Sequence, residues 1–139
     1  MKTFLVIIGI LFFFSGIAYG QTWYTANQVT VQWDAVTELS NGDPVPAGDI
    51  IRYKVWLKNA VTGGEPVELA EIAELEYTIT LNTEGKYFAG VSALRYTSEN
   101  ILLNESTISW SDVAECTAEG PFGIQYFLPL KLPGGLRKK

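Results

Sequence analysis

The residue types that do most enzyme chemistry are scarce in this chain of 139 residues. It has no histidine, which is the commonest general base and a frequent metal ligand. Its one cysteine, Cys116, therefore has no histidine to activate it as a nucleophile. No glycine-rich phosphate-binding loop is present. A catalytic site would have to be built from paired carboxylates, as in glycoside hydrolysis.

Two groups of oxygen-bearing side chains are candidates for chemistry. Four glutamates lie within residues 68–76, but a solvated face explains this spacing in a small β-rich domain. Asn41, Asp43 and Asp49 share one loop and carry the ligands that Ca²⁺ prefers. Their spacing matches no calcium-binding loop, and Asn-Gly-Asp-Pro is typical of a turn. We therefore expect no enzyme activity, no metal site and no cofactor.

Three aromatic residues, Trp23, Tyr24 and Trp56, are candidates for an exposed sugar-binding platform. Trp56 falls on the polar side of an alternating run and is expected to face outward or to lie beneath a loop. Aromatic side chains that cover the edge of a β-sandwich fit the same pattern. Sugar binding is kept as an alternative function without further support in the sequence.

The C-terminal segment, residues 120–139, has the clearest pattern in the chain. From position 122 to 132 every even position is apolar: Phe122, Ile124, Tyr126, Leu128, Leu130 and Leu132. A period of two predicts a strand that buries one face. Because Pro129 and Pro133 lack an N–H group, this strand is expected at a sheet edge or paired along one side only.

Three placements of this segment are open. It folds onto its own domain in place of a first strand, adds to another protein or another copy of the chain, or extends as a mobile tail. The six even-numbered apolar residues, together with Lys131, are the candidate partner-binding residues. An exposed strand of this kind is adhesive, because its backbone groups and its apolar face lack partners.

The elements that position these residues are expected to be short strands separated by turns. The alternating runs cover residues 29–33, 51–57, 77–81 and 87–93, with a weaker run over 67–72 and a last one over 108–113. Residues 65–75 favour helix by propensity. Their neighbours alternate as strands do, so we expect an extended segment there. Many short alternating runs predict an all-β sandwich or barrel.

Four stretches occur in a characteristic order: "VTVQWDAV", "GDIIRYKVWL", "YTITLNTEGKYFAGVSAL" and "NESTISWSDV". In the third, Leu81 stands six residues before Tyr87. This set resembles the second strand, third strand, E–F corner and last strand of a fibronectin type III domain, an immunoglobulin-like β-sandwich. The loop "NGDPVPAGDIIRY" resembles the version found in bacterial and phage secreted proteins. The resemblance implies that the Tyr87 hydroxyl bonds back to the backbone. It also implies a structural core of Trp33, Tyr53, Leu81, Tyr87, Val91 and Trp110.

The sequence departs from that family at two places. Thr83 stands at the corner position where the family usually has proline. Only residues 21–28 precede the second strand, so the first strand is expected to be short or missing. The single Cys116 excludes a disulfide within the domain. Its thiol is expected to be buried or unpaired, or else to pair with another chain.

Residues 1–20 are predicted to be a secretory signal peptide. Lys2 precedes an uncharged apolar run over residues 4–14, and Ala18 and Gly20 are the small residues before a cleavage point. The run is shorter than the roughly 20 residues that a membrane-spanning helix needs. We therefore expect a sandwich over 21–119, the C-terminal segment over 120–139, and a secreted protein without stable membrane insertion after cleavage.

Charge is divided unevenly between these regions. Residues 21–119 hold 5 basic and 15 acidic side chains, a net charge of −10, whereas residues 120–139 hold 4 basic side chains and no acid. The acidic body repels phosphates, which argues against nucleic acid as a partner. The sequence thus predicts a non-enzymatic, secreted or surface-exposed module that binds another protein or another copy of itself. A structural subunit of a filament or virion appendage, assembled by C-terminal strand addition, is the main alternative.

Overall fold

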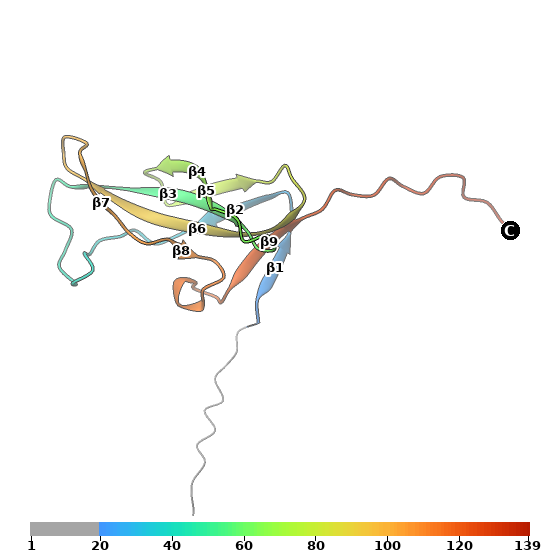
Figure 1. Ribbon diagram of the computed structural model, residues 1–139, viewed down its shortest axis with the longest axis horizontal. Helices are drawn as coiled ribbons and strands as arrows, with labels where there is room; N and C mark the ends of the chain where they lie inside the picture. Colours follow the sequence, from blue (N-terminus) through green and yellow to red (C-terminus); the bar gives the residue numbers. More distant parts are fainter. Residues whose placement is uncertain (1–19) are drawn as a thin grey trace, which may run out of the picture.

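The computed structural model describes residues 20–139, so the predicted signal peptide, apart from Gly20, lies outside the described residues. The described part of the chain is all-β and forms two facing sheets (Figure 1). Its strands are β1 (Thr22–Thr25), β2 (Gln28–Gln32), β3 (Ile50–Asn59), β4 (Val67–Ile72), β5 (Glu76–Thr80), β6 (Gly85–Tyr96), β7 (Leu102–Glu105), β8 (Ser109–Trp110) and β9 (Phe122–Tyr126), with a 3-10 turn η1 (Ala114–Cys116). From residue 20 onward, none of the helical structure is long and apolar enough to cross a membrane.

The larger sheet has the order β1-β9-β6-β3-β4. Its centre is the antiparallel pair of β3 and β6, which runs the full length of β3. Strands β7, β8 and β9 pair one after another with β6. The backbone N–H of Phe122 donates to the carbonyl of Ser111 at 2.8 Å. Residues 112–121, including η1, therefore leave the sheet and return to it as one loop, which we call the 112–121 loop.

The smaller sheet consists of β2 and β5, paired antiparallel from Gln28↔Thr80 to Gln32↔Glu76. Within residues 20–139, β2 has no second strand partner. The four-residue strand β1 pairs in parallel with β9 of the larger sheet instead. One edge of β2 is therefore free.

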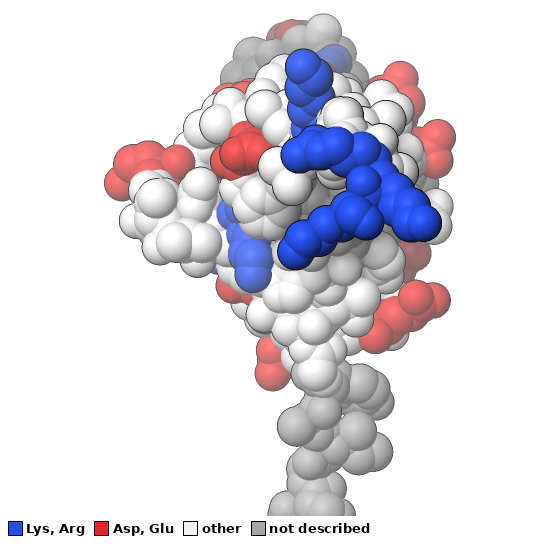
Figure 2. All heavy atoms as spheres, turned by 90° about the vertical axis from the view of Figure 1, so that its right-hand side faces the viewer, with Lys and Arg blue, Asp and Glu red and all other residues white. Residues whose placement is uncertain are grey.

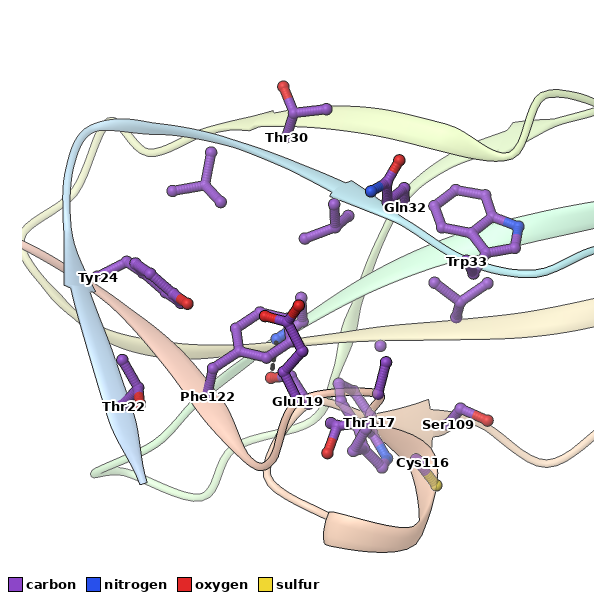
Figure 3. A pocket seen from close by; sticks show the side chains of 18 of the residues that line it. Thr22, Tyr24, Thr30, Gln32, Trp33, Ser109, Cys116, Thr117, Glu119 and Phe122 are labelled. Carbon is purple, nitrogen blue, oxygen red and sulfur yellow. Dashed lines mark hydrogen bonds between the residues drawn. The ribbon is translucent and has the colours of Figure 1, made fainter. Parts of the chain in front are cut away.

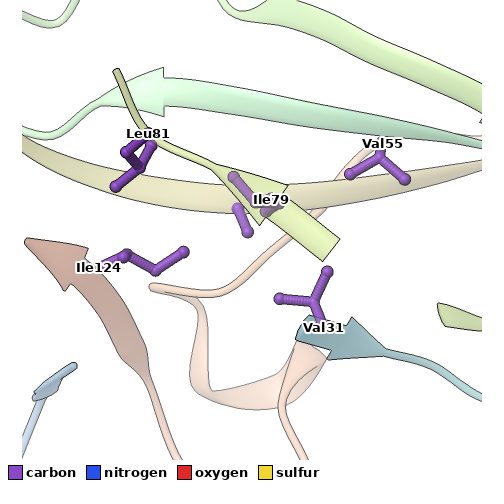
Figure 4. Close-up of a cluster of buried hydrophobic side chains, with 6 residues drawn as sticks. Val31, Val55, Ile79, Leu81 and Ile124 are labelled. Atoms are coloured by element: carbon purple, nitrogen blue, oxygen red, sulfur yellow. The ribbon is translucent and has the colours of Figure 1, made fainter. Parts of the chain in front are cut away.

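The hydrophobic core lies between the sheets. Its buried cluster consists of Val31, Val55, Ile79, Leu81, Ala89 and Ile124 (Figure 4). Alternation places these side chains on the inner faces of β2, β3, β5, β6 and β9, with Leu81 directly after the end of β5. The segment that favours helix by propensity, residues 65–75, is mostly extended, and Val67–Ile72 within it form β4.

The residues predicted for the core occupy four kinds of position. Tyr53 and Leu81 are buried, and the half-buried Tyr87 and Trp33 pack against the buried cluster. Val91 is only half-buried, because it faces an uncovered part of the inner surface.

Trp110 lies outside the cluster, on the outer face of the larger sheet. The register aligns it with Gly90, and Gly90 with the outward-facing Trp56. Trp110 was predicted as a residue of the structural core, but the structure places it away from the buried cluster. Because Gly90 has no side chain, the indole ring packs on its backbone.

The corner between β5 and β6 has the predicted hydrogen bond. The Tyr87 hydroxyl donates to the carbonyl oxygen of Thr83 at 2.8 Å. Leu81, six residues earlier, is buried beneath the same corner.

The C-terminal segment divides at residue 126. Residues 122–126 form β9, which lies between β1 and β6, and Ile124 is completely buried. Residues 127–139, which we call the tail, extend away from the sandwich (Figure 1). Leu130 is 93% exposed and Leu132 is 86% exposed. The alternating pattern is thus packed against the sandwich in its first half, whereas Leu128, Leu130 and Leu132 of its second half are exposed.

Candidate binding groove

A groove of about 920 Å³ runs along the free edge of β2. Its second wall is formed by β8 and the 112–121 loop, and β1 closes one end (Figure 3). The groove exists because three elements fail to cover it. Strand β1 pairs with β9, β8 is only two residues long, and the loop bulges away from the sheet.

The floor of the groove is apolar. It is formed by inward-facing Val29 and Val31 of β2, Trp33 beyond that strand, and Ala89 and Val91 of β6. The ring of Trp33 packs on that of Tyr53 with 5.6 Å between ring centroids. Apolar surface of this kind is unfavourable in water and is stabilised when another side chain covers it.

Two aromatic rings mark the β1 end of the groove. Tyr24 and Phe122 meet edge to face with 5.9 Å between their ring centroids. Both rings point into the space between the walls, whereas Thr30 points away from it (Figure 3). Among the residues that line the groove, Glu119 is the single acidic residue, and none is basic.

The free edge of β2 offers backbone hydrogen bonds. The N–H of Trp33 donates to the carbonyl of Leu75, and the N–H of Leu81 donates to the carbonyl of Asn27. In this register, the odd-numbered residues of β2 are the ones that form backbone hydrogen bonds with β5. In an antiparallel ladder the bonded residues alternate. Three even-numbered residues therefore direct their N–H and C=O groups away from β5, along the groove: Gln28, Thr30 and Gln32.

Cys116 lies on the loop wall of the groove. Its thiol is exposed and forms no disulfide. The prediction of an unpaired cysteine is consistent with this position, whereas a buried thiol is not. The exposed sulfur is a natural chemical reporter for whatever occupies the groove.

The three aromatic candidates for sugar binding do not meet on one surface. Trp56 is half-buried and donates its indole N–H to Ser92 Oγ at 2.9 Å. Trp23 packs over Gly123, with the Lys86 ammonium 5.0 Å from its ring centroid. Tyr24 follows Trp23 directly, so it faces the opposite side of β1, into the groove.

The acidic candidates are engaged in local contacts. Asp49 accepts a hydrogen bond from Arg95 Nε at 2.7 Å, and Asn41 and Asp43 bond to each other within their turn. Glu71 accepts a hydrogen bond from the Tyr96 hydroxyl. This bond, with desolvation as the second cause, raises the pKa of Tyr96 above its ordinary value. Within residues 20–139, no three His, Cys, Asp or Glu side chains gather as metal ligands would.

Sequence reasoning missed β1, the 112–121 loop and the free backbone edge of β2 as parts of one site. The signal that pointed toward them was the shortage of residues before the second strand. Comparisons of the chain with protein-family models, curated proteins and solved structures find no match. The groove is consequently interpreted from its geometry, which combines a row of free backbone groups with an apolar floor.

Proposed function

We propose that this protein is a non-enzymatic, fibronectin type III-like binding module that takes up an extended segment of another protein along β2. The observation that carries the proposal is the free edge of β2 beside an apolar groove. Strand addition of this kind uses backbone hydrogen bonds for affinity and side-chain pockets for specificity. The predicted signal peptide supports a secreted or surface-exposed location.

The size of the groove fits a short strand. Residues of a strand rise about 3.3 Å each, so the five residues of β2 present an edge roughly 17 Å long. An added strand of equal length would bond to Gln28, Thr30 and Gln32. Alternate side chains of that strand would cover the apolar floor.

A second candidate function is a structural subunit of a filament or virion appendage, assembled by strand addition. The exposed, alternating tail favours it, because the chain then contains both a groove and a strand. For carbohydrate binding, the separated positions of Trp23, Tyr24 and Trp56 offer no single platform.

The binding function is tested by panning a display library of random nonapeptides on the immobilised protein. Enriched peptides should alternate apolar residues and should lose binding to Thr30→Pro, which removes a backbone donor on the groove edge. The matched control is Thr78→Pro. Thr78 is the β5 residue opposite Thr30, and its N–H points away from β2 on the other side of the sheet. Peptides that bind both variants equally, or no enrichment at all, would overturn the proposal.

A further inference from the structure

We propose that the groove binds the tail of a second copy of this chain, with residues 128–132 lying parallel to β2. Copies would then join head to tail. This inference rests on the proposed function and names its partner. Three features of the tail support it: its exposure, the positions of its prolines and its charge.

The tail is available to another molecule. The side chains of Leu128, Leu130 and Leu132 are exposed and lie on one face of the alternating pattern. The backbone N–H of Leu128 donates to the Glu84 carboxylate, which holds the root of the tail at the turn between β5 and β6. That turn contributes no residue to the groove, and the tail beyond it runs away from the body (Figure 1).

Proline positions select the orientation of the added strand. Pro129, Lys131 and Pro133 share one face, and the leucines share the other. The leucines must face the apolar floor, so the proline-bearing face must point to solvent. The two prolines lack an N–H, so their backbone nitrogen must also point away from β2.

An antiparallel arrangement cannot satisfy both conditions. In an antiparallel arrangement, the tail residues opposite Gln28, Thr30 and Gln32 would exchange backbone hydrogen bonds with them. The side chains of these tail residues would point outward, as those of Gln28, Thr30 and Gln32 do. If the leucines faced inward, the prolines would be those opposite residues and would leave β2 carbonyls without donors. If the leucines instead took the positions opposite Gln28, Thr30 and Gln32, their side chains would face water.

A parallel arrangement satisfies both conditions. In a parallel pair of strands, a residue whose N–H and C=O groups point toward the other strand lies opposite a residue whose N–H and C=O groups point away. The side chains of these two residues lie on the same face of the sheet. Pro129, Lys131 and Pro133 can then lie opposite Gln28, Thr30 and Gln32, facing solvent with their nitrogens directed outward. The leucines between them supply the N–H and C=O groups to β2 and point to the floor.

Charge favours the same contact. The body of residues 21–119 carries −10, whereas the basic residues of the C-terminal segment all lie in the tail and give it +4. Viewed from the side where the tail leaves, basic side chains gather at the centre and acidic ones lie toward the rim (Figure 2). The parallel arrangement carries residues 137–139 past Gln32 toward Asp34, which is exposed. It also leaves Lys131 at the solvent surface.

The contact would join two different surfaces, a groove on one copy and a tail on the next. Such heterologous contacts produce open chains, or rings where the geometry closes. An open chain therefore retains one unused groove at one end and one unused tail at the other.

The test uses sedimentation velocity on residues 21–139, the chain without its predicted signal peptide, and on two blocked variants of it. Thr30→Pro blocks the groove and leaves the tail intact. Leu130→Asp blocks the tail, because it places a charge on the apolar floor, and leaves the groove intact. Their controls are Thr78→Pro and Leu136→Asp, the latter with the same charge change at a position beyond the docked strand. Circular dichroism confirms that each variant is folded.

We expect the unmodified protein to form a concentration-dependent series of oligomers, as should both controls. Each blocked variant alone should be monomeric, with association weakened by about tenfold or more. An equimolar mixture of the two blocked variants should form a heterodimer and nothing larger, because one functional groove meets one functional tail.

Three results would overturn the inference. They are an unmodified protein that stays monomeric, blocked variants that associate as well as their controls, and a mixture without heterodimer. If library peptides still bind the groove in a Thr30-dependent manner, the proposed function stands and only the identity of the partner is wrong. If they do not, both proposals fail. A tail that docks into its own groove would appear as a monomer whose Cys116 becomes more reactive in Leu130→Asp.

Discussion

The indole ring of Trp23 lies over Gly123, its partner in the parallel pairing of β1 with β9. A Cβ atom at Gly123 would approach the Trp23 ring to 2.4 Å, so the ring occupies the space that a side chain would need. Trp110 and Gly90 repeat this arrangement on β8 and β6, where a Cβ would lie 2.6 Å from the ring. Aromatic residues thus pack on glycine backbone where β1 joins β9 and where β8 joins β6.

The first prediction concerns this contact. Gly123→Ala should destabilise the fold by about 1–3 kcal/mol, because Trp23 or the β1–β9 pair must shift to admit the methyl group. The matched control is Gly64→Ala, where the nearest atom outside the adjacent residues would lie 3.9 Å from the new Cβ. Urea denaturation followed by tryptophan fluorescence measures both. Equal midpoints would show that the Trp23 ring moves aside at little cost.

The second prediction concerns the β5–β6 corner. Tyr87→Phe removes the hydroxyl that donates to Thr83 and should lower the free energy of unfolding by about 0.5–1.5 kcal/mol. Tyr126→Phe is the control, since Tyr126 is half-buried and its hydroxyl makes no hydrogen bond to residues 20–139. A Tyr87→Phe protein as stable as the control would mean that water replaces this bond without loss.

The third prediction concerns alkaline pH. The hydrogen bond to Glu71 raises the pKa of Tyr96 in the folded state above the ordinary value of 10.0. The folded state therefore favours the neutral phenol. This contribution to stability is complete below pH 10.0 and is lost as pH rises through the folded-state pKa.

Absorbance titration of tyrosine ionisation measures this directly. Tyr96→Phe should remove a late-ionising component, and Glu71→Ala should shift that component to lower pH. An unchanged titration curve in Glu71→Ala would contradict the assignment of the shift to this bond.

The fourth prediction uses Cys116 as a reporter of the groove. Its exposed thiol should react with a thiol reagent more slowly as protein concentration rises, because a docked tail covers the wall on which it lies. Leu130→Asp should show the same rate at every concentration, whereas Leu136→Asp should behave like the unmodified protein. A concentration-independent rate in the unmodified protein would argue against occupancy of the groove.

Local patterns predicted much of the fold. Alternation identified most of the inner faces, and the spacing of Leu81 and Tyr87 identified the corner. The sequence did not identify β7, because residues 102–105 are largely exposed and follow no alternation of polarity.

The groove was beyond prediction for a related reason. Its position depends on which strand β1 chooses as its partner, and pairing with β9 spans the whole domain. The sequence of residues 22–25 does not indicate whether this strand pairs with β9 or with β2. The half-exposed state of Val91 follows from that choice and not from its own alternating run.

The last prediction tests the orientation of the docked strand by cross-linking. Opposed residues on neighbouring strands have Cα atoms roughly 4.8 Å apart, which is within the range that a disulfide can bridge. In a Cys116→Ser background, Gln32→Cys on one copy should cross-link with Pro133→Cys on another and not with Pro129→Cys. Gln28→Cys should show the reverse preference, because parallel alignment places the first proline beside the start of β2. An antiparallel strand would exchange the two preferences, and a mobile tail would give neither. The pattern of the four mixtures therefore decides whether the prolines set the direction in which one copy enters the next.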